Sequence, residues 1–402
     1  MSTGFALKEP SGEENQRPED VAARSKGEIS IARESKSPIA VESSKPKRIL
    51  YIDILRILAI AAVLIGHAAA NDVADIAGGK VDTSRWWTAN IIDSSIRWCI
   101  PVFFMISGIL LLDAAKNESY GAFLKKRFLR IGIPFVIWSI FYSFAKHLIL
   151  EPDGVDIKSM PLTALKDILT NNVYYHMWFM YTIMGIYLFV PVIRAALRKF
   201  NMGEVRLLVF LWIIVSIIIP TIQSAYGLIK GEELNIQLFV SPYLTGYLGY
   251  CILGYYLNSI EIGKTARAAF YVGSIAGFVS IPILIYISNI STDTLDENFY
   301  SYFNIPAFLF AIGVFLFIRQ IDWEKKLGNK AKKAVTVLSE ASFGIYLVHL
   351  FIEDKWISRI GILKYMPVGV KILIIFSGTS IISFLFVRLI SSKKKLSRIL
   401  LG

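Results

Sequence analysis

The sequence predicts an all-α membrane protein, a polytopic helical bundle of about ten transmembrane helices with both termini in the cytoplasm. Of its 402 residues, 54% are hydrophobic and 18% are charged, whereas soluble domains usually carry about 25% charged residues. The apolar residues also occur in long runs, close to the roughly 20 residues that a helix needs to cross a bilayer. The mean hydropathy of +0.53 agrees with this class.

Residues 1–46 differ in composition from the rest of the chain. They are rich in Ser, Glu, Lys and Pro, contain few large apolar residues and carry nearly balanced charge. Such a segment cannot bury enough apolar surface to fold, so we expect a disordered cytoplasmic tail. It lacks the short apolar core of a signal peptide, and the first span is therefore expected to act as an uncleaved anchor.

Ten apolar runs follow, and each is predicted to form one membrane-spanning helix. They are 49–70, 91–113, 128–150, 176–195, 206–224, 239–257, 268–289, 302–320, 334–353 and 368–390. Together they form a predicted transmembrane domain over residues 47–392, and a short basic cytoplasmic tail is expected over 393–402.

The positions of the basic residues predict the orientation of the bundle. The great majority of the loop Lys and Arg residues lie in one set of alternate loops, together with both chain ends. Because cytoplasmic loops carry the excess of Lys and Arg, both termini are predicted to be cytoplasmic, as an even number of spans requires. This distribution also accounts for the net charge of +12, so that nucleic acid is not an expected partner.

The cysteines and histidines indicate neither a disulfide framework nor a metal centre. Cys99 and Cys251 each lie in an apolar run, and the four histidines show no metal-ligand spacing. We therefore expect no bound metal and no bound cofactor.

The first span carries ionisable residues that a lipid-facing helix would not tolerate. At about 100° per residue, Asp53, Arg56, His67 and Asn71 fall within roughly 60° of one another. An ionisable side chain in a span costs on the order of 2.5–3.5 kcal/mol, so this stripe should face the bundle interior or a wet cavity. Arg56 and His67 are separated by about 16 Å along the axis, which predicts Arg56 near the cytoplasmic face and His67 beyond the midplane.

These two residue types suit group transfer. Arg56 is always charged and its forked donors suit a phosphate, whereas His67 titrates near neutral pH and can take a proton from a hydroxyl. The alternative is a structural histidine bonded to a neighbouring helix. The shared face with Arg56 and Asp53 favours function, because ionisable groups within membranes are usually functional.

Two further pairs have both a structural and a functional interpretation. Asp93 and Arg97 are four residues apart and either pair with each other at the outer interface or bind substrate. Arg127 and Arg130, before Pro134, are either ordinary positive-inside charge or a clamp for the diphosphate of a donor.

Two histidines at the outer ends of spans have open roles. His176 is followed by Trp178, and the nearby tyrosines form either an interfacial aromatic belt or a platform that stacks on a sugar. His349 shares a helix face with Ser342, Tyr346 and Glu353, which favours hydrogen bonding between helices, with His349 and Glu353 in reach of each other.

One remaining histidine is interpreted as structural. His147 stands alone near an outer helix end and is expected to be interfacial.

Taken together, these motifs resemble acyltransferase family 3, a family of integral membrane proteins, over about residues 47–388. Five motifs in this order on ten spans carry the resemblance. They are Arg56 with His67 after ten intervening residues, Arg97 with the stretch 101–108 (PVFFMISG), 127–130 (RFLR), 176–179 (HMWF) and 343–349 (FGIYLVH). The layout is most similar to the enterobacterial common antigen O-acetyltransferase type, which also lacks an appended extracytoplasmic domain.

The resemblance implies a multi-pass protein of the inner or plasma membrane. Such a protein moves an acyl group, usually acetyl, from cytoplasmic acyl-CoA such as acetyl-CoA to a hydroxyl of a sugar or lipid-linked glycan. By this resemblance His67 is the general base, while Arg56, Arg127 and Arg130 hold the donor's phosphates or polarise its carbonyl. The substrate-binding residues would be Asp93, Arg97, His176, Trp178 and His349. Whether His67 carries the acyl group covalently stays open.

Two alternatives remain open on the sequence. A polar, histidine-bearing cavity would also serve a non-enzymatic exporter or flippase of a polysaccharide or lipid-linked intermediate. A succinyl donor would need the same residues as an acetyl donor.

Overall fold

The computed structural model describes residues 48–75, 83–113, 118–150, 154, 156–236, 246–290 and 295–402. These residues are helical or in turns and loops, with no strand among them. The unit Ile49–Gly402 contains the bundle, and the tail predicted over residues 1–46 lies outside the described residues.

Nine helical segments in the described part of the chain are long and apolar enough to cross a membrane. They are Leu50–Ala74, Ser84–Leu111, Tyr120–Leu150, Trp178–Leu197, Met202–Lys230, Lys264–Asn289, Asn298–Gln320, Asn329–Ile357 and Val368–Ser391. This confirms an all-α polytopic membrane bundle. The other predicted span, 239–257, lies partly outside the described residues, and the cytoplasmic position of the termini stays a prediction.

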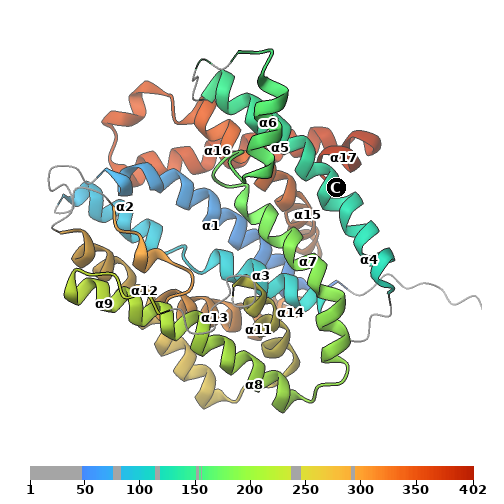
Figure 1. The fold of residues 1–402 in the computed structure, drawn as a ribbon, viewed down its shortest axis with the longest axis vertical. Coiled ribbons are helices and arrows are strands. Elements are labelled where there is room, and N and C mark those ends of the chain that lie inside the picture. Colours follow the sequence, from blue (N-terminus) through green and yellow to red (C-terminus); the bar gives the residue numbers. More distant parts are fainter. Residues whose placement is uncertain are drawn as a thin grey trace, which may run out of the picture. The chain divides into compact units, whose positions relative to one another are not determined.

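Sixteen α-helices of the described residues make up the bundle (Figure 1). They are α1 (Leu50–Ala74), α2 (Ser84–Ser94), α3 (Cys99–Leu111), α4 (Tyr120–Arg127), α5 (Ile133–Ala145), α6 (Met160–Leu169), α7 (Trp178–Leu197), α8 (Met202–Ile213), α9 (Ile219–Lys230), α11 (Tyr247–Ser259), α12 (Lys264–Asn289), α13 (Ile305–Gln320), α14 (Trp323–Lys326), α15 (Asn329–Ile352), α16 (Val368–Ser391) and α17 (Lys394–Leu400).

Several spans are not continuous α-helices. The second is broken by a turn over residues 95–98, between α2 and α3. Four five-residue π-helical segments extend or link helices in other spans: Phe128–Gly132, Lys146–Leu150, Ile214–Ile218 and Glu353–Ile357. Single-turn π segments are frequent at functional sites, and one of these four, Phe128–Gly132, contains the candidate Arg130 and follows the candidate Arg127.

The first span lies at the centre of the bundle, where α1 packs against α2, α3, α15 and α16. Of the apolar window of α1, 61% is buried inside the protein, whereas only 22% of the corresponding window of α12 is. Helix α12 therefore has most of its surface available to lipid, and its exposed residues include Val272 and Ile275. Helix α1, in contrast, contributes polar residues to the protein interior.

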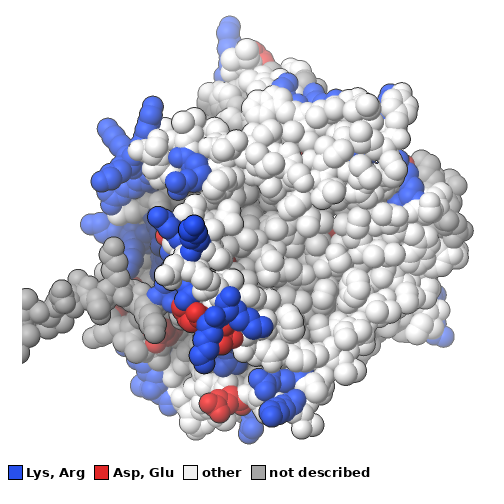
Figure 2. All heavy atoms as spheres, turned by 180° about the vertical axis from the view of Figure 1, so that it is seen from behind, with Lys and Arg blue, Asp and Glu red and all other residues white. Residues whose placement is uncertain are grey.

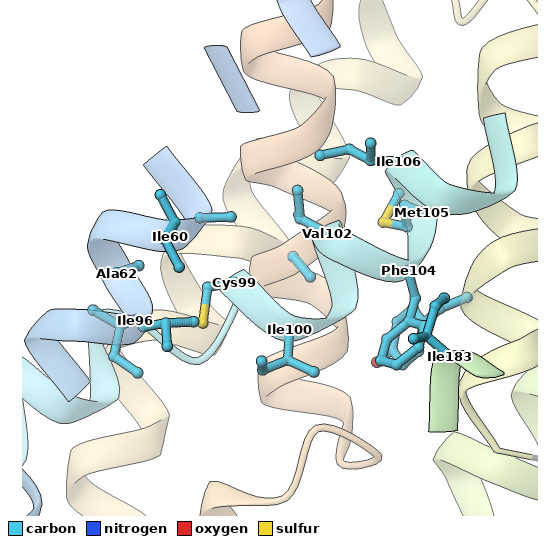
Figure 3. Close-up of a cluster of buried hydrophobic side chains, with 14 of the residues drawn as sticks. Ile60, Ala62, Ile96, Cys99, Ile100, Val102, Phe104, Met105, Ile106 and Ile183 are labelled. Carbon is cyan, nitrogen blue, oxygen red and sulfur yellow. The ribbon is translucent and has the colours of Figure 1, made fainter. Parts of the chain in front are cut away.

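Helices α3 and α11 pack with their backbones in close contact. A Cβ on Gly108 would overlap the carbonyl oxygen of Cys251, and one on Gly254 would overlap that of Met105. Figure 3 shows the apolar side chains around this helix, where Cys99 and Val102 of α3 lie among Ile60 of α1 and other buried residues. This packing fixes α3, and with it the turn before α3.

The surface divides into an apolar and a basic part. On the face shown in Figure 2, Lys and Arg gather toward the left margin, while a broad region from the middle to the right is almost free of charge. A wide uncharged surface suits contact with acyl chains, and basic residues at one end suit the cytoplasmic side of a membrane.

The last residues of the chain are folded against the bundle. Helix α17 contacts α5 and α16, and the Trp138 indole donates a hydrogen bond to the Leu400 carbonyl oxygen (2.9 Å). The basic segment 393–402 thus contains a docked helix.

Candidate functional site

The polar stripe of α1 faces α15, which runs beside it in the same direction (Figure 1). Arg56 Nη1 donates a hydrogen bond to Ser339 Oγ (3.0 Å), and the His67 ring centroid lies 5.3 Å from that of His349. Since both partners belong to α15, Arg56 and His67 face the same neighbouring helix rather than lipid. This agrees with the inward orientation expected from their spacing.

The stripe ends differently from the prediction. Asn71 is exposed, whereas Asp72 is buried and pairs with Arg85 (2.6 Å) and Lys371 (2.8 Å). The prediction for Asn71 was wrong. In the last turn of α1 the residue that faces α2 and α16 is Asp72, which pairs there with the basic residues Arg85 and Lys371.

At the amino-terminal end of the stripe, which is predicted to be cytoplasmic and which we call the inner end, three side chains satisfy one another; we call the opposite end the outer end. Ser339 Oγ donates to Asp53 Oδ1 (2.6 Å), and Arg56 Nη1 lies 3.5 Å from the same carboxylate oxygen. Asp53 is buried and Arg56 is about a quarter exposed. The arginine therefore keeps its charge near the surface while the carboxylate and hydroxyl fix its position.

At the outer end, three histidines from separate parts of the chain converge; we call His67, His176 and His349 the histidine cluster. The centroids of His67 and His349 are 5.3 Å apart, and those of His176 and His349 are 5.4 Å apart. His176 and His349 are almost completely buried. The structure thus brings together three of the four histidines of the chain.

The nitrogens of this cluster are only partly satisfied. His349 Nδ1 lies 2.7 Å from the Tyr346 carbonyl oxygen, while His349 Nε2 and both nitrogens of His176 are buried without a hydrogen-bond partner. Leaving a buried polar group unpaired costs about 1–3 kcal/mol. Such groups in a native protein call for an explanation, of which a ligand-binding role is one.

Tyrosines surround the cluster. Tyr175 contacts the His67 ring (5.4 Å between centroids) and is 54% exposed. Tyr142 contacts His176 (4.7 Å), and the Tyr346 hydroxyl donates to the His176 carbonyl oxygen (2.7 Å). The cluster therefore borders on the surface at Tyr175 and is enclosed elsewhere by aromatic rings.

Arg97 lies in the turn that breaks the second span, and it approaches the histidine cluster. Its guanidinium pairs with Asp93, stacks on the Tyr300 ring (3.8 Å to the centroid) and lies within electrostatic range of His67. Its Nε is buried without a partner. Of the two interpretations of Asp93 and Arg97, the pairing is present, and it leaves the buried Nε of Arg97 without a partner; a substrate role for the two residues stays a prediction.

Further arginines gather near the inner end of the stripe. Arg56, Arg127 and Arg130 all lie within electrostatic range of Tyr187 on α7, and we call these three the arginine cluster. The Arg127 guanidinium lies 5.2 Å from the Phe123 ring and 5.7 Å from the Tyr187 ring, and its Nε has no partner. Arg130 is exposed, in the π-helical segment Phe128–Gly132.

The prediction that His147 has no partner was wrong. His147 is buried and pairs with Asp167 (3.0 Å), which also accepts a hydrogen bond from Ser143 (2.6 Å), so it is not a solitary interfacial residue. Sequence reasoning missed this pair because the carboxylate comes from α6, twenty residues further along the chain.

His349 and Glu353 do not contact each other as the spacing suggested. His349 Nδ1 bonds the carbonyl oxygen of Tyr346 on its own helix, and no hydrogen bond or ion pair joins its ring to the Glu353 carboxylate among the described residues. Glu353 Oε2 is buried without a partner.

Trp178 lies apart from the histidine cluster. Its ring contacts Tyr247 of α11 (5.3 Å) and Phe179 (6.1 Å). It therefore forms part of the aromatic packing between α7 and α11. Stacking of Trp178 on a sugar ring stays a prediction.

The sequence analysis missed several partners of the candidate residues. Nothing in the local sequence distinguishes these partners from ordinary core or interface residues. They are recognised only by their contacts in the structure: Ser339 with Arg56, Tyr187 with Arg127 and Tyr300 with Arg97. Arg194 was counted as a loop charge, but it is buried and donates to the Leu111 carbonyl oxygen at the end of α3 (2.7 Å). No local pattern distinguishes such residues.

The described residues contain no group of three or more His, Cys, Asp or Glu side chains that could hold a metal ion. The arrangement offers instead imidazole bases at one end of α1 and guanidinium groups at the other. Chemically it can take a proton from a hydroxyl and bind an anion.

Comparison with known proteins gives one family and one named relative. A model described as an acyltransferase domain, of acyltransferase family 3, matches residues 49–388. A protein of the Acidianus two-tailed virus named "Putative acetyltransferase ORF330" is 26% identical over 296 residues, covering 70% of this chain and 82% of the relative. No solved structure matches the chain significantly.

Proposed function

Because this multi-pass membrane protein belongs to acyltransferase family 3, we propose that it moves an acetyl group across the membrane. The donor would be cytoplasmic acetyl-CoA, and the acceptor a hydroxyl of a cell-surface or lipid-linked carbohydrate. The inner or plasma membrane would be its location. The viral relative's name, an acetyltransferase, supports acetyl over succinyl as the group transferred.

The observation that carries this proposal is the division of α1 into two ends. The arginine cluster and Tyr187 lie toward the basic end, and the histidine cluster lies about 16 Å away along the helix. An acyl-CoA has the same polarity, with phosphates at one end and a thioester at the end of a long arm. This match supports a donor that enters from the cytoplasm and offers its thioester to the histidines.

In this proposal, Arg127 and Arg130 hold the phosphates of the donor. Arg127 has an unpartnered Nε and lies 5.7 Å from the Tyr187 ring, and Arg56 and Arg130 are within electrostatic range of the same tyrosine. Charge-assisted bonds from arginine to phosphate are among the stronger hydrogen bonds in proteins. Arg56, fixed by Asp53 and Ser339, adds positive charge behind them.

The transfer itself takes place at the histidine cluster. His67 accepts the proton of the acceptor hydroxyl, the hydroxyl oxygen bonds to the acyl carbonyl carbon, and the carbon–sulfur bond breaks. The proton then passes from His67 to the leaving thiolate, so that ester and free thiol are formed and the histidine is restored. Arg97, within range of His67, is better located than Arg56 to polarise the carbonyl oxygen.

The test is transfer of labelled acetyl from acetyl-CoA to carbohydrate in membranes that contain the protein. We expect transfer with the wild type, and a loss of about 100-fold or more with His67→Ala, the range for removing a general base. His147→Ala, which removes a buried histidine outside the cluster, should retain transfer.

Three outcomes would contradict parts of the proposal. Full transfer by folded His67→Ala protein would exclude its catalytic role. Labelling from succinyl-CoA alone would change the donor. Movement of glycan across the membrane without any acyl-CoA would favour the exporter.

A further inference from the structure

The tautomer of His349 is determined by its surroundings. A carbonyl oxygen only accepts hydrogen bonds, so the 2.7 Å contact between His349 Nδ1 and the Tyr346 carbonyl oxygen places a proton on Nδ1. The neutral ring then has a lone pair on Nε2. His349 is consequently a hydrogen-bond acceptor at its free nitrogen, held in one orientation by the backbone of its own helix.

This acceptor is buried and has no partner. His349 has no exposed surface, and its Nε2 is among the buried atoms without a hydrogen bond. Since the unpaired acceptor costs about 1–3 kcal/mol, its retention suggests that a donor reaches it during function.

The nearest donor-bearing ring is that of His67. The two ring centroids are 5.3 Å apart, and a ring nitrogen lies about 1.2 Å from its centroid. Facing nitrogens would therefore be about 3 Å apart, which is the length of a hydrogen bond. Catalytic hydrogen bonds are often unformed without substrate and tighten in the complex.

The other groups around His67 do not supply an acceptor for its N–H. Tyr175 contacts it ring to ring, His176 packs against His349, and the guanidinium of Arg97 carries only donors. Among the described residues, the histidine–carboxylate pair is His147 with Asp167. His147 thus has a carboxylate as its neighbour, whereas the ring of His67 has the imidazole of His349 as its neighbour.

We propose that His349 is the positioning residue of the general base: its Nε2 accepts a hydrogen bond from the N–H of His67 when substrate binds. This bond fixes the tautomer of His67, so that its second nitrogen carries the lone pair that receives the hydroxyl proton. It also stabilises the imidazolium that forms, as an acceptor behind a catalytic histidine does elsewhere. The inference rests on the proposed role of His67.

Two substitutions at position 349 separate this role from a structural one. The amide of glutamine reaches the place of Nε2, whereas that of asparagine reaches the place of Nδ1. In His349→Asn the bond to the Tyr346 carbonyl is kept and the acceptor for His67 is lost. In His349→Gln the acceptor is kept and the bond to Tyr346 is lost.

We expect kcat for acetyl transfer to fall about 100-fold in His349→Asn, the upper range for partners of this kind, and at most about 10-fold in His349→Gln. His147→Asn serves as the matched control and should retain kcat. Equal losses in both variants, a greater loss in His349→Gln, or full activity in His349→Asn would each overturn the inference.

A second measurement needs no substitution and no acetyl transfer. With only four histidines in the chain, solid-state nitrogen-15 spectra of the histidine-labelled wild-type protein in lipid can be assigned residue by residue. His349 should be neutral with its proton on Nδ1, and a His349 that is charged or protonated on Nε2 would overturn the inference. If this result holds while wild-type membranes transfer no acetyl group, the proposed function fails and the tautomer stands.

Discussion

Both ends of α1 place polar residues against α15, yet the two ends differ in how their polar groups are satisfied. At the inner end, Asp53, Arg56 and Ser339 pair with one another across α1 and α15. At the outer end, His349 and His176 retain buried nitrogens without partners.

This difference indicates that the polar groups at the inner end stabilise the helix packing, whereas those at the outer end are available to bind a ligand. A polar network whose members satisfy one another stabilises a fixed packing of helices and is damaged when one member is lost. Unpaired buried nitrogens instead lower stability, and such costs are common at functional sites. We therefore expect substitutions at the inner end to change stability first, and substitutions at the outer end to change activity first.

The largest effect on stability is expected from Asp53→Ala. It removes the buried carboxylate that accepts a hydrogen bond from Ser339 and lies beside Arg56, and leaving a buried polar group without its partner costs about 1–3 kcal/mol. Thermal unfolding of the detergent-solubilised protein would measure this. Lys325→Ala breaks the exposed pair with Asp322 and keeps the Asp322 side chain that caps α14. It is the matched control and should leave the unfolding temperature unchanged, and equal effects of the two substitutions would contradict the difference between the two ends.

A smaller effect is expected from Arg127→Ala, through donor binding. Loss of one charge-assisted bond to a phosphate is worth about 1.5 kcal/mol, so the KM for acetyl-CoA should rise roughly tenfold with kcat little changed. Steady-state transfer at several donor concentrations measures this. A fall in kcat with unchanged KM would show that Arg127 acts at the reacting carbonyl and not on the phosphates.

His176→Phe, at the outer end, should have the opposite effect on stability from Asp53→Ala at the inner end. Phenylalanine keeps the ring contacts with Tyr142 and Tyr346 and removes two unpartnered nitrogens, so the free energy of unfolding should increase by about 1 kcal/mol. Acetyl transfer should decrease at the same time. A destabilised variant would indicate that these nitrogens are satisfied in the membrane and that the outer end is as structural as the inner one.

The smallest effect is expected from Asn71→Ala. Its side chain is exposed, and surface substitutions of this kind usually change stability by less than about 0.5 kcal/mol. Unfolding and acetyl transfer should both match the wild type. A clear loss of acetyl transfer would instead show that Asn71 acts together with Arg56 and His67, although its side chain is exposed in the structure.

Much of the helical framework and part of the site followed from local sequence patterns. Apolar runs of span length predicted the all-α membrane bundle, and the periodicity of Asp53, Arg56 and His67 predicted a stripe that faces the interior. The spacing of Asp93 and Arg97 indicated their pairing as one of two interpretations. Each of these depends on the geometry of a single helix, which sequence determines closely.

Interactions between distant segments could not be obtained in this way. The broken second span was predicted as one helix over 91–113, because the turn at residues 95–98 has no Gly or Pro signal of its own. The π segment at Glu353–Ile357 likewise has no local sequence signal. The pairing of His147 with Asp167, and the stacking of Arg97 on Tyr300, depend on helices that meet only in the folded bundle.

The amino-acid sequence by itself determined that this protein is an all-α membrane bundle and that α1 carries basic and imidazole groups on one face. These properties follow from hydrophobicity and helical periodicity, which act over a few turns. Only the tertiary structure decided that His176 and His349 meet His67, and which nitrogens remain unpaired there. That outcome depends on how close-packed helices orient rings toward one another, a matter of a few ångströms that no local pattern encodes.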